Sequence, residues 1–471
     1  MARQSLNWTS PFTTLDEDIF YAKVSPSALI NPRWVDINES LLKEINLPLD
    51  AEDSLVLDAF SGGSPLEGWR PIAQVYSGHQ FGQWAGQLGD GRGLYLGEYG
   101  DFEWHLKGAG KTPFSRFGDG RSVLRSAIRE YLGSEYMHAL GISTTRALTL
   151  VASDTPVQRE ALERGATLMR LAKSHLRIGH FEHFYHRNSH QHLREIIEFA
   201  IAELDSDLSA EADRIEIAFS RYIERSANLV ASWMAVGFVH GVMNTDNTAL
   251  SGETLDYGPY GFLTSYQENY VINHTDQTGR YAYGQQPRVM YWNLACLAET
   301  LTPFVTVETL RSRLDEFPSL YQKAYRNQMA MRLAIDPEHD ELPELVDDAK
   351  ALFSDANFFY PELFSALLNH EAPLSRKLLE NRSFVELRER WSKIAEQGDR
   401  LQTAQNVCPA WMLSHWLLDQ VIERAETGDY QPIRNLRQSI NAGLSNQSET
   451  GLKLGGSPPA PDSAYHLSCS S

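Results

Sequence analysis

The stretch from His240 to Gly258, HGVMNTDNTALSGETLDYG, constrains the chain more than any other. It follows an uncharged segment whose apolar content predicts a buried helix over residues 226–243. A loop that leaves the end of a buried helix can hold polar groups rigidly at a cleft. Within this loop Asn247 and Asp256 supply a neutral and an anionic oxygen, which suit a Mg²⁺ ion that also binds phosphate. The stretch therefore predicts a loop that handles phosphate.

The same loop resembles the catalytic loop of phosphotransferases with a kinase-like fold, but with one displacement. In those enzymes the loop opens with His, carries a catalytic Asp two positions later and closes with a metal-binding Asn, and a second Asp heads a later D-F-G triplet. His240, Asn247 and the triplet 256–258 (Asp, Tyr, Gly) fit this order. Val242 stands in the catalytic position, and an Asp is found at the far end instead, as Asp246. Two interpretations stay open here, an inactive kinase and a different reaction.

Composition limits the partners. The chain has 471 residues, 42% of them hydrophobic, which is enough for a two-lobed enzyme with a large core. Its formal charge of −19 argues against nucleic-acid and membrane partners, because both need a basic surface. Local Arg and Lys must therefore hold any phosphate. The residues leave the oligomeric state open.

The cysteines and the N-terminus predict a cytoplasmic setting. Cys296, Cys408 and Cys469 are far apart and show no CxxC spacing, so neither a zinc ribbon nor a secreted disulfide framework is indicated. The first residues contain no apolar segment of the signal-peptide kind.

Local patterns predict a small β-rich part followed by a larger helical part, an α+β fold class. Segments 92–100 and 101–110 alternate apolar and polar residues around a Gly-Asp turn and predict a hairpin. Residues 121–141 have helical spacing, residues 144–153 predict a further strand, and apolar spacing from about 195 to 437 is mostly helical.

These patterns divide the chain into four regions. We expect an N-terminal extension over residues 1–60, a nucleotide-binding lobe over 61–180 and a helical lobe over 181–437 that carries the catalytic and activation loops. Residues 438–471 are rich in Ser, Gly and Pro and predict a flexible tail that carries Cys469.

Two copies of the tetrapeptide GDGR flank the predicted hairpin. Their glycines let backbone N–H groups approach phosphates, and an Arg in the same loop can bind phosphate through two N–H groups. A connection that is merely rich in turns is the alternative. The candidate residues are Gly89, Gly91, Arg92, Asp119 and Gly120.

Four charged side chains are further candidates. Lys107, on a predicted strand, precedes Glu130, on the next helix, in the order of the ion pair by which kinases hold phosphates. Arg170 and Arg177 lie two turns apart if their segment is helical, so both would project from one face and suit a triphosphate. Solvated surface charges are the alternative for both pairs.

A competing cluster lies in HFEHFYHRNSHQH. His183, His186 and His190 have helical spacing, Glu182 is adjacent, and together they could bind zinc. No HExxH motif occurs, and an amphipathic helix with exposed His explains the pattern as well.

In this order the motifs resemble those of the SelO (selenoprotein O) family of protein adenylyltransferases. The resemblance runs from about residue 5 to residue 430 and rests on YSGHQFGQWAGQLGDGRG, HLKGAGKTPFSRFGDGRSVLRSAIREYL, MRLAKSHLRIGHFEHF and HGVMNTDNTALSGETLDYGPYGF. It implies a two-lobed, protein-kinase-like fold. It also implies that ATP binds in reversed orientation and that AMP passes to Ser, Thr or Tyr hydroxyls of proteins.

The resemblance also implies residue roles. Asp246 would accept the proton of the attacking hydroxyl, Asn247 and Asp256 would hold Mg²⁺, and Glu130 would orient Lys107. ATP would be lined by Gly89, Gly91, Arg92, Lys107, Asp119, Gly120, Arg170, Arg177 and Asp256. Use of Mn²⁺, and of UTP for uridylyl transfer, stays open.

The C-terminal Cys or Sec of many family members implies redox control, and Cys469 fits that position. Residues 256–287, the expected activation loop, contain no Cys, so a disulfide would need Cys296 or Cys408. Two other functions are weighed against AMP transfer. One is a kinase that transfers the γ-phosphoryl group, against which Val242 counts, and the other is a silent nucleotide-binding scaffold, against which the retained metal-binding residues count.

Overall fold

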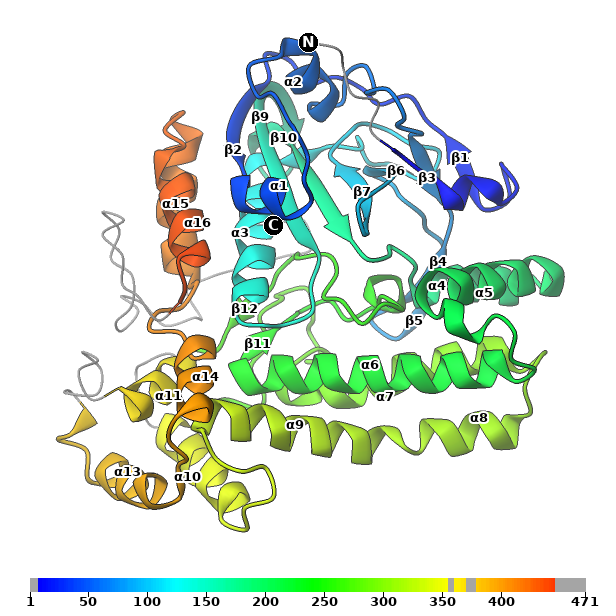
Figure 1. The fold of residues 1–471 in the computed structure, drawn as a ribbon. Helices are drawn as coiled ribbons and strands as arrows, with labels where there is room; N and C mark the ends of the chain where they lie inside the picture. Colours follow the sequence, from blue (N-terminus) through cyan, green and yellow to red (C-terminus); the bar gives the residue numbers. More distant parts are fainter. Residues whose placement is uncertain (1–6, 355–359, 370–377, 445–471) are drawn as a thin grey trace.

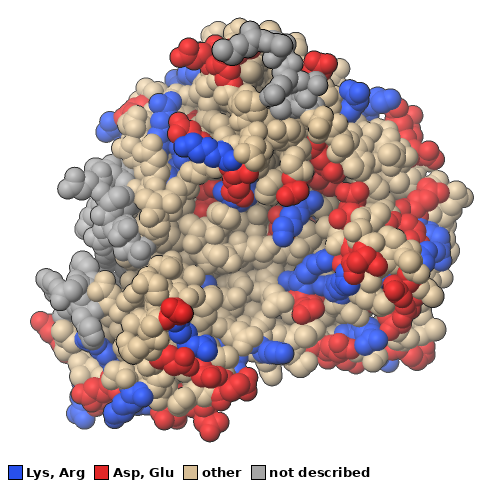
Figure 2. Space-filling view, in the orientation of Figure 1, with Lys and Arg blue, Asp and Glu red and all other residues tan. Residues whose placement is uncertain are grey.

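The computed structural model describes residues 7–354, 360–369 and 378–444, which form a mixed α/β fold with a sheet above a set of helices (Figure 1). The part of the predicted tail from residue 445 onward, with Cys469, lies outside the described residues. On the face drawn in Figure 2, acidic side chains are spread widely and basic ones do not gather in one patch, as the net charge of −19 leads one to expect.

An eight-stranded antiparallel sheet forms the first part. Its order is β1-β3-β6-β7-β10-β9-β2, with β8 paired to β10. The predicted hairpin is present as β6 and β7, and residues 1–60 supply the strands at both ends of the order, β1 and β2. The bounds are β1 (Tyr21–Lys23), β2 (Arg33–Ile37), β3 (Ile72–Gln74), β6 (Gly93–Tyr99), β7 (Phe102–Lys107), β8 (Ser122–Val123), β9 (Arg146–Gln158) and β10 (Leu162–Ala172).

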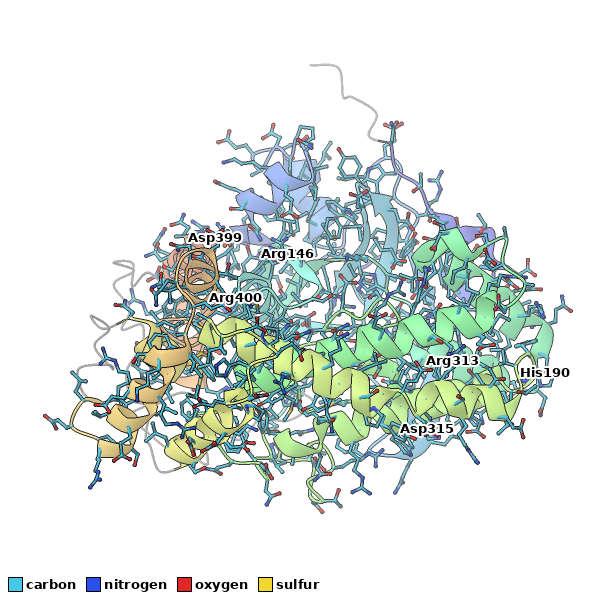
Figure 3. The ribbon with its side chains drawn as sticks, turned by 60° about the horizontal axis from the view of Figure 1, so that its bottom comes forward. Arg146, His190, Arg313, Asp315, Asp399 and Arg400 are labelled. Atoms are coloured by element: carbon cyan, nitrogen blue, oxygen red, sulfur yellow. The ribbon has the colours of Figure 1, made fainter. Side chains whose placement is uncertain are left out.

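Helices cover the sheet and build the second part. Helix α3 (Leu124–Ala139), predicted at 121–141, packs against β9 and β10. Below the sheet, α6 (Arg214–Val236) packs against α7, α8 and α9, and Arg313, labelled in Figure 3, joins α8 to α6 through Glu216. The other helices are α1 (Glu39–Glu44), α2 (Ser54–Phe60), α4 (Ile178–Tyr185), α5 (His190–Leu204), α7 (Gln286–Leu301), α8 (Val307–Leu314), α9 (Phe317–Leu333), α10 (Leu342–Ser354), α11 (Tyr360–Leu368), α13 (Arg382–Ile394), α14 (Asp399–Val407), α15 (His415–Glu426) and α16 (Gln431–Asn441).

The prediction of a buried helix over 226–243 is wrong at its C-terminal end. Helix α6 ends at Val236 because Gly237 adopts a left-handed φ of 69°, a standard way to end a helix. The chain continues as β11 (Phe238–Val239), which pairs with β12 (Gly261–Phe262). The loop that begins at His240 therefore runs between two paired strands, β11 and β12, which fix both of its ends. Among the described residues, no helix is long and apolar enough to cross a bilayer.

Helix α16 packs against elements from the N-terminal part of the chain. It lies beside β2, whose residues come about 400 positions earlier in the chain, and beside α3, whose residues come about 300 positions earlier (Figure 1). Its buried Arg437 forms an ion pair with Asp36 on β2, and Tyr131 on α3 donates a hydrogen bond to the same carboxylate at 3.0 Å. These buried partners tie three distant segments together.

We predict that Arg437→Ala lowers the free energy of unfolding by about 3 kcal/mol, because it leaves the buried Asp36 carboxylate without its counter-charge. Urea denaturation measures this change. The control is Arg382→Ala, which removes the exposed Arg382–Glu386 pair and should leave the denaturation midpoint unchanged. Equal shifts in the two variants would contradict the prediction.

Candidate active site

One cavity of about 460 Å³ gathers nearly all the residues that the sequence singled out. It lies between the sheet, the loops that carry the two GDGR copies and the loop that follows β11. Glu130 does not line the cavity but lies behind Lys107. The predicted residues that line it are Gly89, Gly91, Arg92, Lys107, Asp119, Gly120, Arg170, Arg177, Asp246, Asn247 and Asp256.

Lys107 and Glu130 form a buried ion pair. Lys107 is the last residue of β7, and its Nζ lies 2.5 Å from Glu130 Oε2 on α3. Both residues are more than nine-tenths buried. A solvated surface pair is therefore excluded, and the pair fixes the lysine at the cavity wall.

The prediction that Arg170 and Arg177 share one helical face is wrong. Arg170 lies on strand β10, and Arg177 immediately precedes α4. The error has a physical cause, since β10 is buried on both faces at Leu168, Met169 and Leu171, and such a strand shows no alternation that would distinguish it from a helix. The two guanidinium groups nevertheless reach the same carboxylate.

That carboxylate is Asp256, which three cations share. Its Oδ1 lies 2.5 Å from Arg170 Nη1 and 3.2 Å from Lys107 Nζ, and its Oδ2 lies 2.9 Å from Arg177 Nη1. Burial by itself would raise the pKa of Asp256, but Arg170, Lys107 and Arg177 hold it well below its usual value. Asp256 also has a left-handed φ of 61°, a strained conformation that these ion pairs help to maintain.

Asp246 has a contrasting environment. It lies in a short 3₁₀ turn, Thr245–Asn247, and is 7% exposed. Burial raises its pKa to about 6, although a hydrogen bond from Gln80 and the charge of Arg177 oppose the rise. Arg177 Nη1 also donates to the backbone carbonyl of Asp246 at 2.9 Å. A carboxyl group that titrates near neutrality can accept a proton during a reaction.

Asn247 is fixed by its own loop. Its Nδ2 donates to the carbonyl of Val242 at 3.0 Å, which directs the amide oxygen the other way. Val242 also lines the cavity, so the position that holds the base in kinases presents an apolar side chain.

The two GDGR loops are closely packed. Gly89 has φ 107°, and a Cβ there would lie 2.6 Å from the Phe114 ring. Gly120 has φ 71°, and a Cβ there would lie 2.1 Å from the carbonyl of Gly110. Both positions therefore require glycine. Asp119 is held at the rim by Arg159, 2.8 Å away.

Several lining residues were missed by sequence reasoning. Arg159 comes from the turn between β9 and β10, and Gln80 comes from β4 (Ser77–Gln80), which pairs with β5 (Gln83–Gln87). Tyr76, whose ring lies under the Arg177 guanidinium at 4.8 Å, was missed as well. No local spacing relates these residues to the others, although Tyr76 and Gln80 both lie within YSGHQFGQWAGQLGDGRG.

The competing histidine cluster, weighed against an amphipathic helix with exposed His, does not come together. His190 begins α5 at the outer edge of the molecule (Figure 3), and His183 is buried against Ser77 Oγ at 3.0 Å. Only Glu182 and His186 come together, and His79 joins them, with ligand atoms within 4.8 Å of one another.

The two cysteines that the structure describes are buried. Burial raises the pKa of the Cys296 and Cys408 thiols to about 12, which disfavours the reactive thiolate. A disulfide with Cys469 stays a prediction, because Cys469 lies outside the described residues.

We predict that Asp256→Asn lowers the free energy of unfolding by roughly 3 kcal/mol, because it leaves three clustered cations with too little negative charge. Pyrophosphate without metal should then raise the thermal midpoint of the variant more than that of the wild type. Asp119→Asn, at the cavity rim, is the control and should show a smaller loss and no added response. Equal responses to pyrophosphate in the wild type and Asp256→Asn would refute the prediction.

A comparison with known proteins identifies the family of the chain. A family model described as protein adenylyltransferase SelO matches residues 2–441, nearly the whole chain. The three loops that bound the cavity and every residue placed in it lie within that match. The chain therefore belongs to the SelO family of protein adenylyltransferases and is a nucleotidyltransferase.

Proposed function

We propose that this enzyme transfers AMP from ATP to Ser, Thr or Tyr hydroxyls of proteins, with ATP reversed relative to its orientation in kinases. The observation that carries the proposal is the position of the Asp246 carboxylate within the loop. The apolar Val242 occupies the place of the kinase base, and the buried Asp246 at the other end of the loop is poised to accept a proton. A reversed nucleotide brings the α-phosphorus, rather than the γ, to the acceptor.

The reaction then follows from the groups present. The acceptor hydroxyl oxygen attacks the α-phosphorus and forms the new P–O bond, while its proton passes to Asp246. The bond between the α-phosphorus and the oxygen that bridges to the β-phosphorus breaks, and pyrophosphate leaves with that electron pair.

Three cations are suited to stabilise the leaving group. Lys107, Arg170 and Arg177 converge within 3.2 Å of the Asp256 carboxylate, so their N–H groups already point at one anionic centre. Cations fixed in this way stabilise charge that develops in the transition state without having to reorganise. Arg92 and the glycine loops line the rest of the cavity and would bind the remainder of ATP.

The residues fit a divalent cation. Asp256 offers carboxylate oxygens, and Asn247 offers an amide oxygen directed away from its own loop. These two would hold Mg²⁺ or Mn²⁺, which when bound offsets phosphate charge. Transfer of UMP from UTP with Mn²⁺ is a further activity that this site would allow.

The arrangement also supports a kinase-like two-lobed fold. The sheet with Lys107 on β7 and Glu130 on α3 would be the small lobe, and α4 to α16 would be the large one. The free thiols of Cys296 and Cys408 suit a reducing, cytoplasmic setting.

The first test compares ATP labelled on the α-phosphate with ATP labelled on the γ-phosphate. With Mg²⁺ and a mixed protein extract, we expect label on protein from α-labelled ATP only, and we expect Asp246→Asn to reduce the rate by about 10²–10⁴. Label from γ-labelled ATP would establish a kinase instead, and ATP binding without transfer would establish a scaffold.

The second prediction concerns pH. Asp246 must be ionised to accept a proton, and its pKa is raised to about 6, so activity is present above that pH and is lost as pH falls through it. We expect kcat/KM for ATP to fall about tenfold per pH unit on the acid side. Initial rates at fixed Mg²⁺–ATP measure the profile. A rate that is constant down to pH 5 would exclude Asp246 as the base.

A further inference from the structure

The hairpin of β4 and β5 lies directly against the catalytic loop. The main-chain N–H of His79 donates to Thr245 Oγ1 at 2.7 Å, and the side chain of Gln80 donates from Nε2 to Asp246 Oδ2 at 3.0 Å. The N–H of Phe81 donates to Asn244 Oδ1 at 3.2 Å. Three consecutive hairpin residues therefore contact three consecutive loop residues that are more than 160 positions away in the chain.

A buried carboxylate joins the hairpin to the loop. Glu182, on α4, is fully buried, and its Oε2 accepts a hydrogen bond from Thr245 Oγ1. Its Oε1 lies 2.6 Å from His79 Nδ1. Its two oxygens thus connect the hairpin and the loop to α4, so Glu182 forms a structural bridge between them.

The contact between hairpin and loop is tight at position 78, where a side chain would require Asp246 or Thr245 to shift by a few tenths of an ångström. A Cβ on Gly78 would lie 3.0 Å from Asp246 Cβ and Oδ1 and 3.1 Å from Thr245 Oγ1. The backbone of the hairpin therefore packs against the carboxylate itself.

We propose that Gln80 is a positioning residue for the base Asp246. His79, Glu182 and Thr245 hold the β4–β5 hairpin at a fixed position against the loop, so that Gln80 reaches Asp246. This inference rests on the proposed function, because it assigns Gln80 a role through Asp246. Among the described residues, Asp246 Oδ1 is buried without a hydrogen-bond partner. Gln80 thus fixes one carboxylate oxygen and leaves the other for the proton of the acceptor.

Arg177 and Gln80 hold different parts of Asp246. Arg177 Nη1 donates to its backbone carbonyl at 2.9 Å, and Gln80 Nε2 donates to its carboxylate at 3.0 Å. Loss of Gln80 therefore leaves the backbone contact in place and removes the contact that orients the carboxylate.

The test compares Gln80→Leu with Gln83→Leu, the same change at the residue paired with Gln80 across the hairpin and exposed to solvent. We expect Gln80→Leu to lower kcat for AMP transfer by about 10- to 100-fold and to leave KM for ATP within about twofold. Gln83→Leu should match the wild type in both. An unchanged kcat in Gln80→Leu would overturn the proposal.

A second measurement needs no turnover. Thermal midpoints of Gln80→Leu, Asp246→Asn and the double variant form a double-mutant cycle. Because the two side chains are in contact, we expect that the shifts of the single variants do not add in the double variant. Additive shifts would overturn the contact. If the wild type transfers no AMP, the proposed function fails, whereas the cycle still decides whether Gln80 holds Asp246.

A third measurement tests the role of Glu182. Zn²⁺ added to the wild type and to His186→Ala should leave both thermal midpoints unchanged. A Zn²⁺-dependent rise in the wild type alone would assign His79, Glu182 and His186 to a metal site and overturn the bridge.

Discussion

The convergence of Lys107, Arg170 and Arg177 on Asp256 is the interaction on which the rest of the site depends. Each cation comes from a different segment, β7, β10 or the start of α4, and Asp256 comes from the loop that follows β11. Lys107, Arg170 and Arg177 are buried and Asp256 is partly buried, so without one another these charged groups would carry a large desolvation cost. The ion pairs therefore require that the sheet, α4 and the loop assemble together, and this assembly creates the cavity.

The two carboxylates of the loop differ because their neighbours differ. Asp256 is surrounded by cations, which hold its pKa well below the usual value against the effect of burial. Asp246 is buried with a neutral amide as its side-chain partner, and burial raises its pKa to about 6. Two carboxylates whose pKa values are moved in opposite directions are suited to different tasks. One is suited to carry a permanent negative charge, and the other to accept and release a proton. The loop thus separates the two roles within ten residues.

Much of this could be predicted from sequence, and the failures have physical causes. The hairpin that ends at Lys107 and the helix that carries Glu130 follow from local patterns, whereas their pairing was suggested by the order found in kinases, with solvated surface charges as the alternative. Arg170 was assigned to a helix because β10 is buried on both faces, yet its place at the site was expected. Gln80 and Arg159 could not be assigned roles, since tertiary contacts alone bring them to the cavity.

The loop carries its acidic residue at position 246 and not at position 242, and the two positions have different surroundings in the structure. A base beside Val242 would face the cavity from the loop's beginning, whereas Asp246 lies at the point where the loop meets the β4–β5 hairpin and α4. There its backbone is held by Arg177, its neighbour Thr245 by Glu182, and its carboxylate by Gln80. A carboxylate at this end is therefore held, directly or through its neighbour, by the hairpin, Arg177 and α4. Because Arg177 binds both the Asp246 backbone and the Asp256 carboxylate, a shift in either loop position would be transmitted to the other.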